Sequence, residues 1–308
     1  MNVCSLKRPK SDCNRRGNVL LFEKKGVPDM TGKPIVAIMY DFDRTLSTRD
    51  MQEYSFIPSL GMDSGEFWSF ANELGSREHM DSVLAYMYAM VRMSEQRGRP
   101  LKRSQLVDMG RSVEFFDGVE DWFGRINAFG GECGVTVEHY IISSGMREII
   151  EGTKIADKFR SIFACEFLYD SSGKPVWPKT DVNYTNKTQF VYRINKGVLD
   201  IENDVDLNRS MPDDSKRVPF CNMIYIGDGL SDVPCMKMMK AYGGYSIAVY
   251  QDRKKVEALL ERNRVDFIYP ADYREGSGLD VTVRNIIRKM SISDVLFHEN
   301  AAQKRSYE

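Results

Sequence analysis

The chain has 308 residues, 42% hydrophobic and 28% charged, so it can bury a substantial core as one domain with a large insertion or as two domains. Its 43 Lys and Arg residues nearly balance its 44 Asp and Glu residues, which argues against nucleic acid or an anionic membrane as a partner and favours a small soluble substrate. No apolar stretch reaches the roughly 20 residues of a membrane helix, and no secretory signal pattern is present, so we expect a cytoplasmic protein.

Six cysteines and three histidines are scattered along the chain. No two cysteines form a C-x-x-C pair, which argues against a disulfide framework and against a structural zinc site. His79, His139 and His298 lack the spacing of a metal site, so we interpret all three as structural.

The first 33 residues form a polar and basic segment with one apolar patch at residues 19–22. This composition indicates an appended N-terminal arm that is compatible with disorder. A nucleic-acid-binding tail is the alternative, but the segment lacks the interleaved aromatic residues of such tails.

An apolar run at residues 35–40 predicts a buried strand, and the sequence DFDRT follows it directly. Side chains repeat every second residue in an extended chain, so Asp41 and Asp43 should emerge on one face at the carboxyl end of this strand. Two carboxylates placed there can bind a cation and perform separate chemical tasks. Aspartates also cap turns, so the pair alone leaves both interpretations open.

Residues 49–116 follow a helical rhythm without a convincing strand. Apolar residues recur at three- and four-residue spacing in residues 66–74 and 82–93, as amphipathic helices require. We therefore expect a helical cap inserted just after the first strand. Such an insertion would lie over the carboxyl edge of the sheet, where α/β proteins bind ligands.

Further apolar runs predict strands that are covered on both faces, at residues 140–142, 162–167, 223–226 and 246–249. Strands of this kind alternating with helical stretches are typical of an α/β fold with a Rossmann-like parallel sheet. We assign residues 34–48 and 117–290 to this core, with a small hairpin at residues 169–185. Residues 291–308 are expected to form a C-terminal tail.

Polar motifs follow three of these strands. Ser143, Ser144 and Gly145 precede a helix expected to start at Met146, where hydroxyl and backbone N–H groups can hold a phosphate or simply cap the helix. Lys187 lies in the first turn of a helix expected over residues 186–197, where a lone lysine is also common surface decoration.

The sequence GDGLSD follows the strand at residues 223–226 and places Asp228 and Asp232 four residues apart on a glycine-rich loop. Two aspartates so placed suit a hard cation such as Mg²⁺, although an acidic capped turn would look the same.

The order of these motifs resembles the haloacid dehalogenase superfamily, specifically its phosphoserine phosphatase-like branch with a helical C1-type cap. The motifs are Asp41-x-Asp43-x-Thr45, then Ser143, then Lys187, then Gly227-Asp228-x-x-x-Asp232. The resemblance extends over residues 35–249.

The resemblance implies a Mg²⁺-dependent phosphatase that acts on a small phosphorylated metabolite through an aspartyl-phosphate. Asp41 would be the nucleophile and Asp43 the general acid and base. Ser143, helped by backbone groups near Ser144 and Gly145, would bind the phosphoryl oxygens.

The same resemblance assigns the charged groups around the nucleophile. Lys187 would hold both the nucleophile and the phosphate. Mg²⁺ would be bound by the Asp41 carboxylate, the Asp43 backbone carbonyl and Asp228, with Asp232 binding through water or supporting these ligands.

Other charged residues compete for roles at this site. Lys196, at a predicted helix end, and Lys179 are weaker alternatives to Lys187. Asp50 lies where the acidic residue of phosphoserine phosphatases receives the substrate amine, or it caps an exposed helix. Arg44 is interpreted as a solvated or loop-bracing arginine without a catalytic role.

The cap departs from the phosphoserine phosphatase pattern. Residues 78–92 contain no obvious counterpart of the arginine that grips the carboxylate of serine, and a rough comparison places Met87 there. This departure argues against phosphoserine itself as the substrate. A phosphotransferase or mutase, which passes the phosphoryl group to a bound acceptor, carries the same motifs and is kept as an alternative. A non-catalytic phosphoacceptor or binding protein is a further one, and no oligomeric state is indicated.

Overall fold

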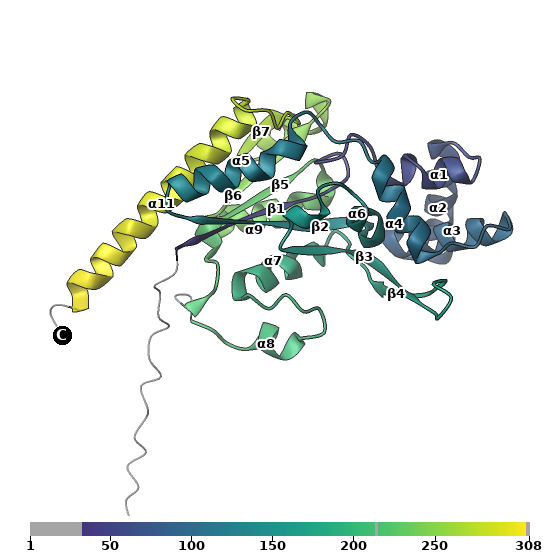
Figure 1. Ribbon diagram of the computed structural model, residues 1–308, viewed down its shortest axis with the longest axis horizontal. Coiled ribbons are helices and arrows are strands. Elements are labelled where there is room, and N and C mark those ends of the chain that lie inside the picture. The colour runs from purple at the N-terminus through teal and green to yellow at the C-terminus, as the bar shows by residue number, and fades with distance from the viewer. Residues whose placement is uncertain (1–32, 213–214, 306–308) are drawn as a thin grey trace, which may run out of the picture. The chain divides into compact units, whose positions relative to one another are not determined.

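The computed structural model describes residues 33–212 and 215–305, so the expected N-terminal arm, apart from Lys33, lies outside the described residues. A seven-stranded sheet with the order β4-β3-β2-β1-β5-β6-β7 forms its centre (Figure 1). Neighbouring strands are parallel except for the antiparallel pair β3 and β4. The strands are β1 (Ile35–Tyr40), β2 (Thr136–Met146), β3 (Ser161–Tyr169), β4 (Pro175–Thr180), β5 (Met223–Gly227), β6 (Tyr245–Tyr250) and β7 (Phe267–Pro270).

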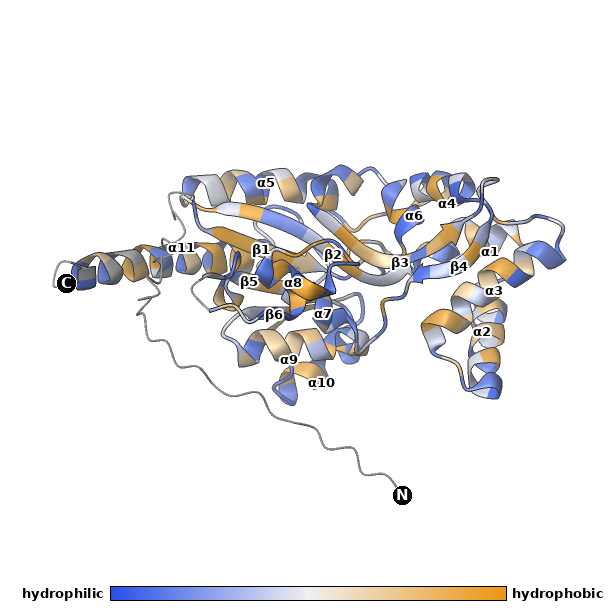
Figure 2. Cartoon of the chain, turned by 90° about the horizontal axis from the view of Figure 1, so that it is seen from below, coloured by the Kyte–Doolittle hydropathy of each residue, from blue (hydrophilic) through white to orange (hydrophobic). Residues whose placement is uncertain are grey.

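Helices cover both faces of the sheet, which explains why its middle strands are apolar throughout. Every residue of β5 is buried, and so is β1 apart from Ile35. On one face lies α5 (Val119–Glu132) with α11 (Gly278–Arg305) against it, and on the other lie α7 (Lys187–Lys196) and α9 (Val233–Ala241) (Figure 2). The predicted α/β fold with a mainly parallel sheet is confirmed.

Two strands differ from what the sequence predicts. β2 is longer than its apolar centre, and a register shift between Ile142 and Met146 keeps Ser143, Ser144 and Gly145 within the strand. The helix after it, α6 (Arg147–Glu151), therefore starts one residue later than expected. β7 is not among the predicted strands, since its apolar run has only four residues, and in the structure it is an edge strand with no fully buried residue.

Two further predictions concern the hairpin and the C-terminal tail. The predicted hairpin is confirmed, since β3 and β4 are antiparallel neighbours. The C-terminal tail expected from residue 291 is helical through Arg305, because α11 continues through residue 290 without a break. Leu279, Val283 and Met290 hold the first half of that helix on the core at helical spacing.

The segment between β1 and β2 is helical. It contains η1 (Met51–Glu53), α1 (Phe56–Ser59), α2 (Ser64–Glu78), α3 (Ser82–Gln96), α4 (Arg103–Met109) and η2 (Gly110–Ser112). The chain enters and leaves this segment side by side, because Ser47 and Phe115 form an antiparallel bridge. Helices α2 and α3 pack against each other at one end of the sheet (Figure 1).

The last helix of this segment packs directly on the core. A Cβ atom on Gly152, just after α6, would lie 1.7 Å from the carbonyl oxygen of Val107 in α4. Only glycine allows the two backbones to approach so closely. This contact ties α4 to α6, so α2 and α3 form the part of the segment that stands free of the core helices.

Shorter elements complete the described chain. They are η3 (Ala156–Lys158), α8 (Asp204–Asn208), η5 (Phe220–Asn222), η6 (Leu230–Asp232), η7 (Arg253–Lys255) and α10 (Glu257–Glu261). Within residues 33–212 and 215–305, no helix is long and apolar enough to cross a membrane. The described cysteines, Cys133, Cys165, Cys221 and Cys235, are all free.

A buried chain of hydrogen bonds crosses the core beside β1. Trp122 Nε1 donates to the hydroxyl of Tyr40 (2.8 Å), which donates to His139 Nδ1 (3.0 Å). His139 Nε2 then donates to Asn127 Oδ1 (2.9 Å). Burial lowers the pKa of His139 to about 3, only partly offset by Glu138, so the imidazole stays neutral in the folded protein. The structural interpretation of His139 is confirmed.

Replacing this histidine should remove a source of acid sensitivity. The pKa of His139 in the folded chain lies below the ordinary value of about 6.5, so the unfolded chain binds the extra proton as the pH falls. Relative to His139→Gln, the wild type should lose about 1.4 kcal/mol of unfolding free energy per pH unit between pH 6.5 and pH 4.5. Urea unfolding across this range measures the difference. Parallel pH profiles of the two proteins would contradict the prediction.

Candidate active site

A buried ammonium group joins three separate parts of the chain at the carboxyl end of β1. Lys187 Nζ lies 3.1 Å from Asp41 Oδ2 and 2.8 Å from Asp232 Oδ1, and the Lys187 side chain is fully buried. Burial alone would lower the pKa of Lys187, but Asp232 and Asp41 outweigh it and raise this pKa. The lysine is therefore charged and bound to two carboxylates.

Backbone groups of β5 and of the next residue hold Asp41 in place. Its N–H donates to the carbonyl of Ile226 in β5 (2.9 Å). Its Oδ1 accepts the N–H of Phe42 (2.7 Å), which leaves Oδ2 for Lys187. Burial raises the pKa of Asp41 to about 6 although Lys187 opposes the shift.

Asp232 is engaged on both of its oxygens. Oδ1 accepts the Tyr225 hydroxyl (2.7 Å) in addition to Lys187, and Oδ2 accepts the N–H of Gly229 (3.2 Å). A Cβ atom on Gly227 would lie 2.5 Å from the Asp232 carboxyl carbon, so only glycine leaves room for this carboxylate. Asp232 thus anchors the lysine rather than facing the cavity.

Asp228 completes a group of carboxylates around Asp41. Oxygens of Asp41, Asp228 and Asp232 lie within 4.8 Å of one another. Burial, followed by the charges of Asp232 and Asp41, raises the pKa of Asp228 to about 8. Among the described residues, Lys187 is the one cation in direct contact with this group. Three carboxyl groups therefore share a single ammonium group.

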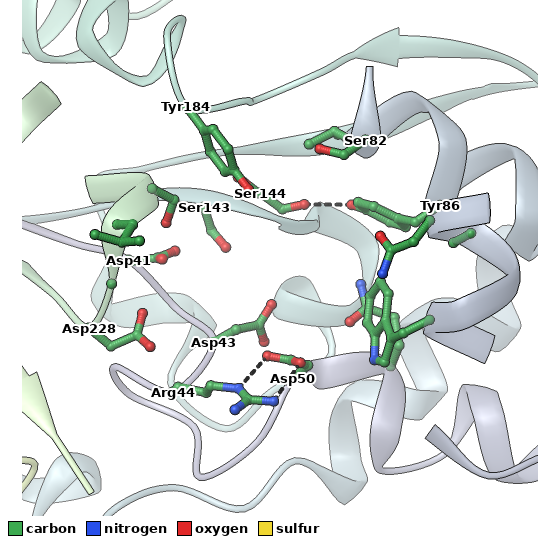
Figure 3. A pocket seen from close by; sticks show the side chains of 18 of the residues that line it. Asp41, Asp43, Arg44, Asp50, Ser82, Tyr86, Ser143, Ser144, Tyr184 and Asp228 are labelled. Carbon is green, nitrogen blue, oxygen red and sulfur yellow. Dashed lines mark hydrogen bonds and ion pairs between the residues drawn. The ribbon is translucent and has the colours of Figure 1, made fainter. Parts of the chain in front are cut away.

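Asp43 lies beside this group and faces the same space (Figure 3). Its Oδ1 accepts the N–H of Met51 (2.8 Å). A Cβ atom on Gly145 would lie 2.8 Å from Asp43 Oδ2, so the glycine makes room for this carboxylate. Burial, then the charges of Asp50 and Asp41, raises the pKa of Asp43. A carboxyl group so placed takes up a proton more readily than an exposed aspartate does.

The end of β2 brings hydroxyl groups to the cavity beside Asp41. Ser143 and Ser144 both line the cavity, and the Ser144 Oγ is buried without a hydrogen-bond partner in the described part of the chain. The N–H of Gly145 donates to Ser143 Oγ (3.0 Å). The carbonyl of Ser144 accepts the hydroxyl of Tyr86 from α3 (2.5 Å), which links the cap helices to this strand.

The cavity has a volume of about 650 Å³ and lies between the carboxyl ends of the strands and helices α2 and α3. Among its lining residues are Asp41, Asp43, Asp50, Ser143, Ser144 and Asp228. Lys187 and Asp232 lie behind Asp41, and Gly145 lies behind Asp43. All the candidate site residues of the sequence therefore meet at one place.

Two residues at the mouth of the site pair with each other. Arg44 Nε and Nη2 donate to Asp50 Oδ1 (2.8 Å) and Oδ2 (2.9 Å). Arg44 has a positive φ of 58°, an uncommon conformation that turns the loop after Asp43. The interpretation of Arg44 as a loop-bracing residue is confirmed, and its partner is the aspartate that the family pattern would offer to a substrate amine.

The two alternative lysines lie elsewhere. Lys196 Nζ donates to the carbonyls of Leu207 (2.6 Å) and Arg209 (2.8 Å). Lys179 pairs with Glu166 at the surface of the hairpin. Neither contacts Asp41.

Sequence reasoning did not identify several groups that surround the cavity. Tyr225 reads as one apolar position in a buried strand, although its hydroxyl supports Asp232. Trp68, Gln52 and Tyr184 line the cavity, and nothing in their local sequence distinguishes them from packing or loop residues. Tyr86 has the helical spacing of a core residue, and its side chain is buried in the core.

The donor set fits a divalent cation. Asp41 and Asp228 offer carboxylate oxygens, the ligands that Mg²⁺ prefers, close to each other and to Asp232. At an effective dielectric constant near 20, each pair of like charges about 4 Å apart costs roughly 4 kcal/mol. Lys187 offsets only part of this repulsion, so the site as built would gain stability from a second positive group.

Removing the buried ammonium group of Lys187 should destabilise the protein more than removing that of Lys196, at the other end of α7. Lys187→Met leaves Asp41 and Asp232 buried without their shared partner, and we expect a loss of about 3–5 kcal/mol in unfolding free energy at pH 8. The loss should shrink toward pH 5, because the unpaired carboxylates then bind protons in the folded state.

Lys196→Met is the matched control for this experiment. It removes only bonds to carbonyls, so we expect a loss of about 1–2 kcal/mol without this pH dependence. Chemical denaturation at both pH values provides the measurement. Equal effects of the two substitutions would refute the assignment of Lys187 as the central cation.

Comparison with known proteins connects this geometry to a family. A family model described as haloacid dehalogenase-like hydrolase matches residues 38–237. An uncharacterized protein of Borreliella burgdorferi is 28% identical in an alignment of 274 positions that covers 80% of this chain and 94% of that protein.

Solved structures share the fold at low sequence identity. A HAD family hydrolase from Salmonella enterica serovar Typhi superposes with a TM-score of 0.53 at 15% identity, covering 82% of this chain and 72% of that chain. A probable phosphoserine phosphatase from Vibrio cholerae superposes with a TM-score of 0.51 at 16% identity, covering 85% and 67% respectively. The family match spans more than half of the sequence and includes Asp41, Ser143, Lys187 and Asp228. As the order of the motifs predicts, the chain belongs to the haloacid dehalogenase-like hydrolase family.

Proposed function

We propose that this chain is a Mg²⁺-dependent phosphatase that hydrolyses a small phosphorylated metabolite through a phosphorylated Asp41. The observation that carries the proposal is the setting of the Asp41 carboxylate, held by Lys187 at the edge of a cavity into which Asp43 also projects. One carboxylate oriented by a cation and a second one that readily carries a proton are the two groups that covalent phosphoryl transfer requires.

In the first step an Asp41 oxygen attacks phosphorus, a new P–O bond forms, and the ester P–O bond breaks. Asp43 gives its proton to the leaving alkoxide, a role that its raised pKa supports. Ser143 and Ser144 lie where their hydroxyl groups can donate to the phosphoryl oxygens, and the Ser144 Oγ has no other partner within residues 33–212 and 215–305.

In the second step Asp43, now ionised, takes a proton from water. The oxygen of that water attacks phosphorus, the bond between Asp41 and phosphorus breaks, and inorganic phosphate leaves. Lys187 stays paired with Asp41 throughout and keeps it oriented between the two steps.

The metal would be held by Asp41 and Asp228, with the Asp43 carbonyl, while Asp232 keeps Lys187 in place. When bound, Mg²⁺ would supply positive charge that reduces the repulsion between the Asp41 carboxylate and the phosphate dianion. Phosphoryl transfer depends mainly on such positioning and charge compensation.

The test is phosphate release from a broad panel of phosphomonoesters, with Mg²⁺ or with EDTA. The wild type should turn over at least one ester with Mg²⁺ only. Asp41→Asn should lose activity by a factor of about 10³ or more. Asp121→Asn, at an exposed position on α5, is the matched control and should keep full activity.

The possible results separate the alternatives. Metal-dependent turnover by Asp41→Asn would remove Asp41 as the nucleophile. Consumption of an ester with transfer to an added alcohol and no phosphate release would replace hydrolysis by phosphotransfer. Complete inactivity of a folded wild type across the panel would count against the proposed function.

A further inference from the structure

The wall of the cavity that faces the aspartates carries no charged side chain. Helices α2 and α3 supply this wall, and the residues they contribute are all uncharged: Trp68, Ala71, Asn72, Ser82, Val83 and Tyr86. The part of a substrate that extends from the phosphate toward the cap meets an indole ring, an amide and hydroxyl groups. A charged group placed against this wall would lose water without gaining a counter-ion from it, which is unfavourable. The two cations that line the cavity, Arg44 and Lys255, come from the loop after β1 and from η7.

The one carboxylate on this side that could receive an ammonium group is already paired. Asp50 accepts two hydrogen bonds from Arg44, one on each oxygen, and the two side chains face each other at the cavity wall (Figure 3). Arg44 also approaches Glu53, with Nη2 4.0 Å from Oε1. A bidentate pair uses the carboxylate more completely than a single contact does.

A neutral polar group in the cavity lacks a partner. Gln52 is only 2% exposed, and its Oε1 forms no hydrogen bond within the described residues. Gln52 follows Asp50 by two residues and lines the same cavity. A buried carbonyl oxygen without a donor is costly, so it favours a ligand that brings a hydrogen-bond donor, such as a hydroxyl group, to it.

We propose that the phosphate ester taken by this site carries an uncharged, hydroxyl-bearing alcohol, such as a polyol or a sugar, and that Arg44 excludes amine-bearing alcohols by neutralising Asp50. The inference rests on the proposed function and specifies its substrate class. Trp68 supplies an apolar surface for the carbon skeleton, while Gln52, Asn72 and Ser82 offer hydrogen bonds that need no charge.

Three short esters test the wild type. 2-Hydroxyethyl phosphate, phosphoethanolamine and phosphoglycolate differ chiefly in the end group, which is a hydroxyl, an ammonium or a carboxylate. We expect kcat/KM for the hydroxyl ester to exceed the other two by about tenfold or more. Glycerol 3-phosphate compared with phosphoserine should show the same preference.

Two substitutions test the ion pair from both sides. Arg44→Asn removes the cation, and asparagine tolerates the positive φ at this position. The ratio of kcat/KM for phosphoethanolamine to that for 2-hydroxyethyl phosphate should rise by about fivefold or more, because Asp50 is then free to bind the ammonium group. Asp50→Asn removes the bidentate partner of Arg44 and leaves only the more distant Glu53. It should raise the ratio of kcat/KM for phosphoglycolate to that for 2-hydroxyethyl phosphate instead. Ratios cancel any general loss of rate.

Each result decides between the proposals. A wild type that prefers phosphoethanolamine, or an unchanged ratio in both variants, overturns the inference about the substrate and leaves the phosphatase function intact. No hydrolysis of these esters or of p-nitrophenyl phosphate by the folded wild type overturns the proposed function and this inference together.

Discussion

The contact on which the rest of this site depends is the buried ammonium of Lys187 between Asp41 and Asp232. It joins the end of β1, the start of α7 and the loop after β5, three segments that are far apart in the sequence. Burying these charges is expensive, and the geometry offsets the cost only because the lysine meets both carboxylates and Asp232 has further donors in Tyr225 and Gly229. The fold at this edge is therefore built around an electrostatic arrangement as much as around an apolar core.

That arrangement is unbalanced in a way that suits the family's chemistry. Asp41, Asp43 and Asp228 all have raised pKa values, because burial and mutual repulsion disfavour their charged forms. Shifts of this kind are common where a carboxylate must act as a nucleophile or exchange a proton. Helices α2 and α3 cover the site without adding charge to it.

Much of the fold and site could be predicted from the sequence, because the signals were local. The apolar run of β1 leads straight into Asp41 and Asp43, and Lys187 starts a helix whose apolar face is plain. β7 has too few buried residues to stand out. The pairing of Arg44 with Asp50, the unpartnered oxygen of Gln52 and the hydroxyl link from Tyr86 to Ser144 depend on how the loop and cap settle, which no spacing rule conveys.

The central claim is that the carboxylates around Lys187 form a binding site for one divalent cation, and calorimetric titration with Mg²⁺ tests it most directly. The account predicts one Mg²⁺ per wild-type chain and an affinity lower by about tenfold or more in Asp228→Asn, which loses a ligand but not the lysine pair. Asp121→Asn, remote from the site, should bind like the wild type. No binding by the folded wild type, or equal affinities in all three proteins, would contradict the account.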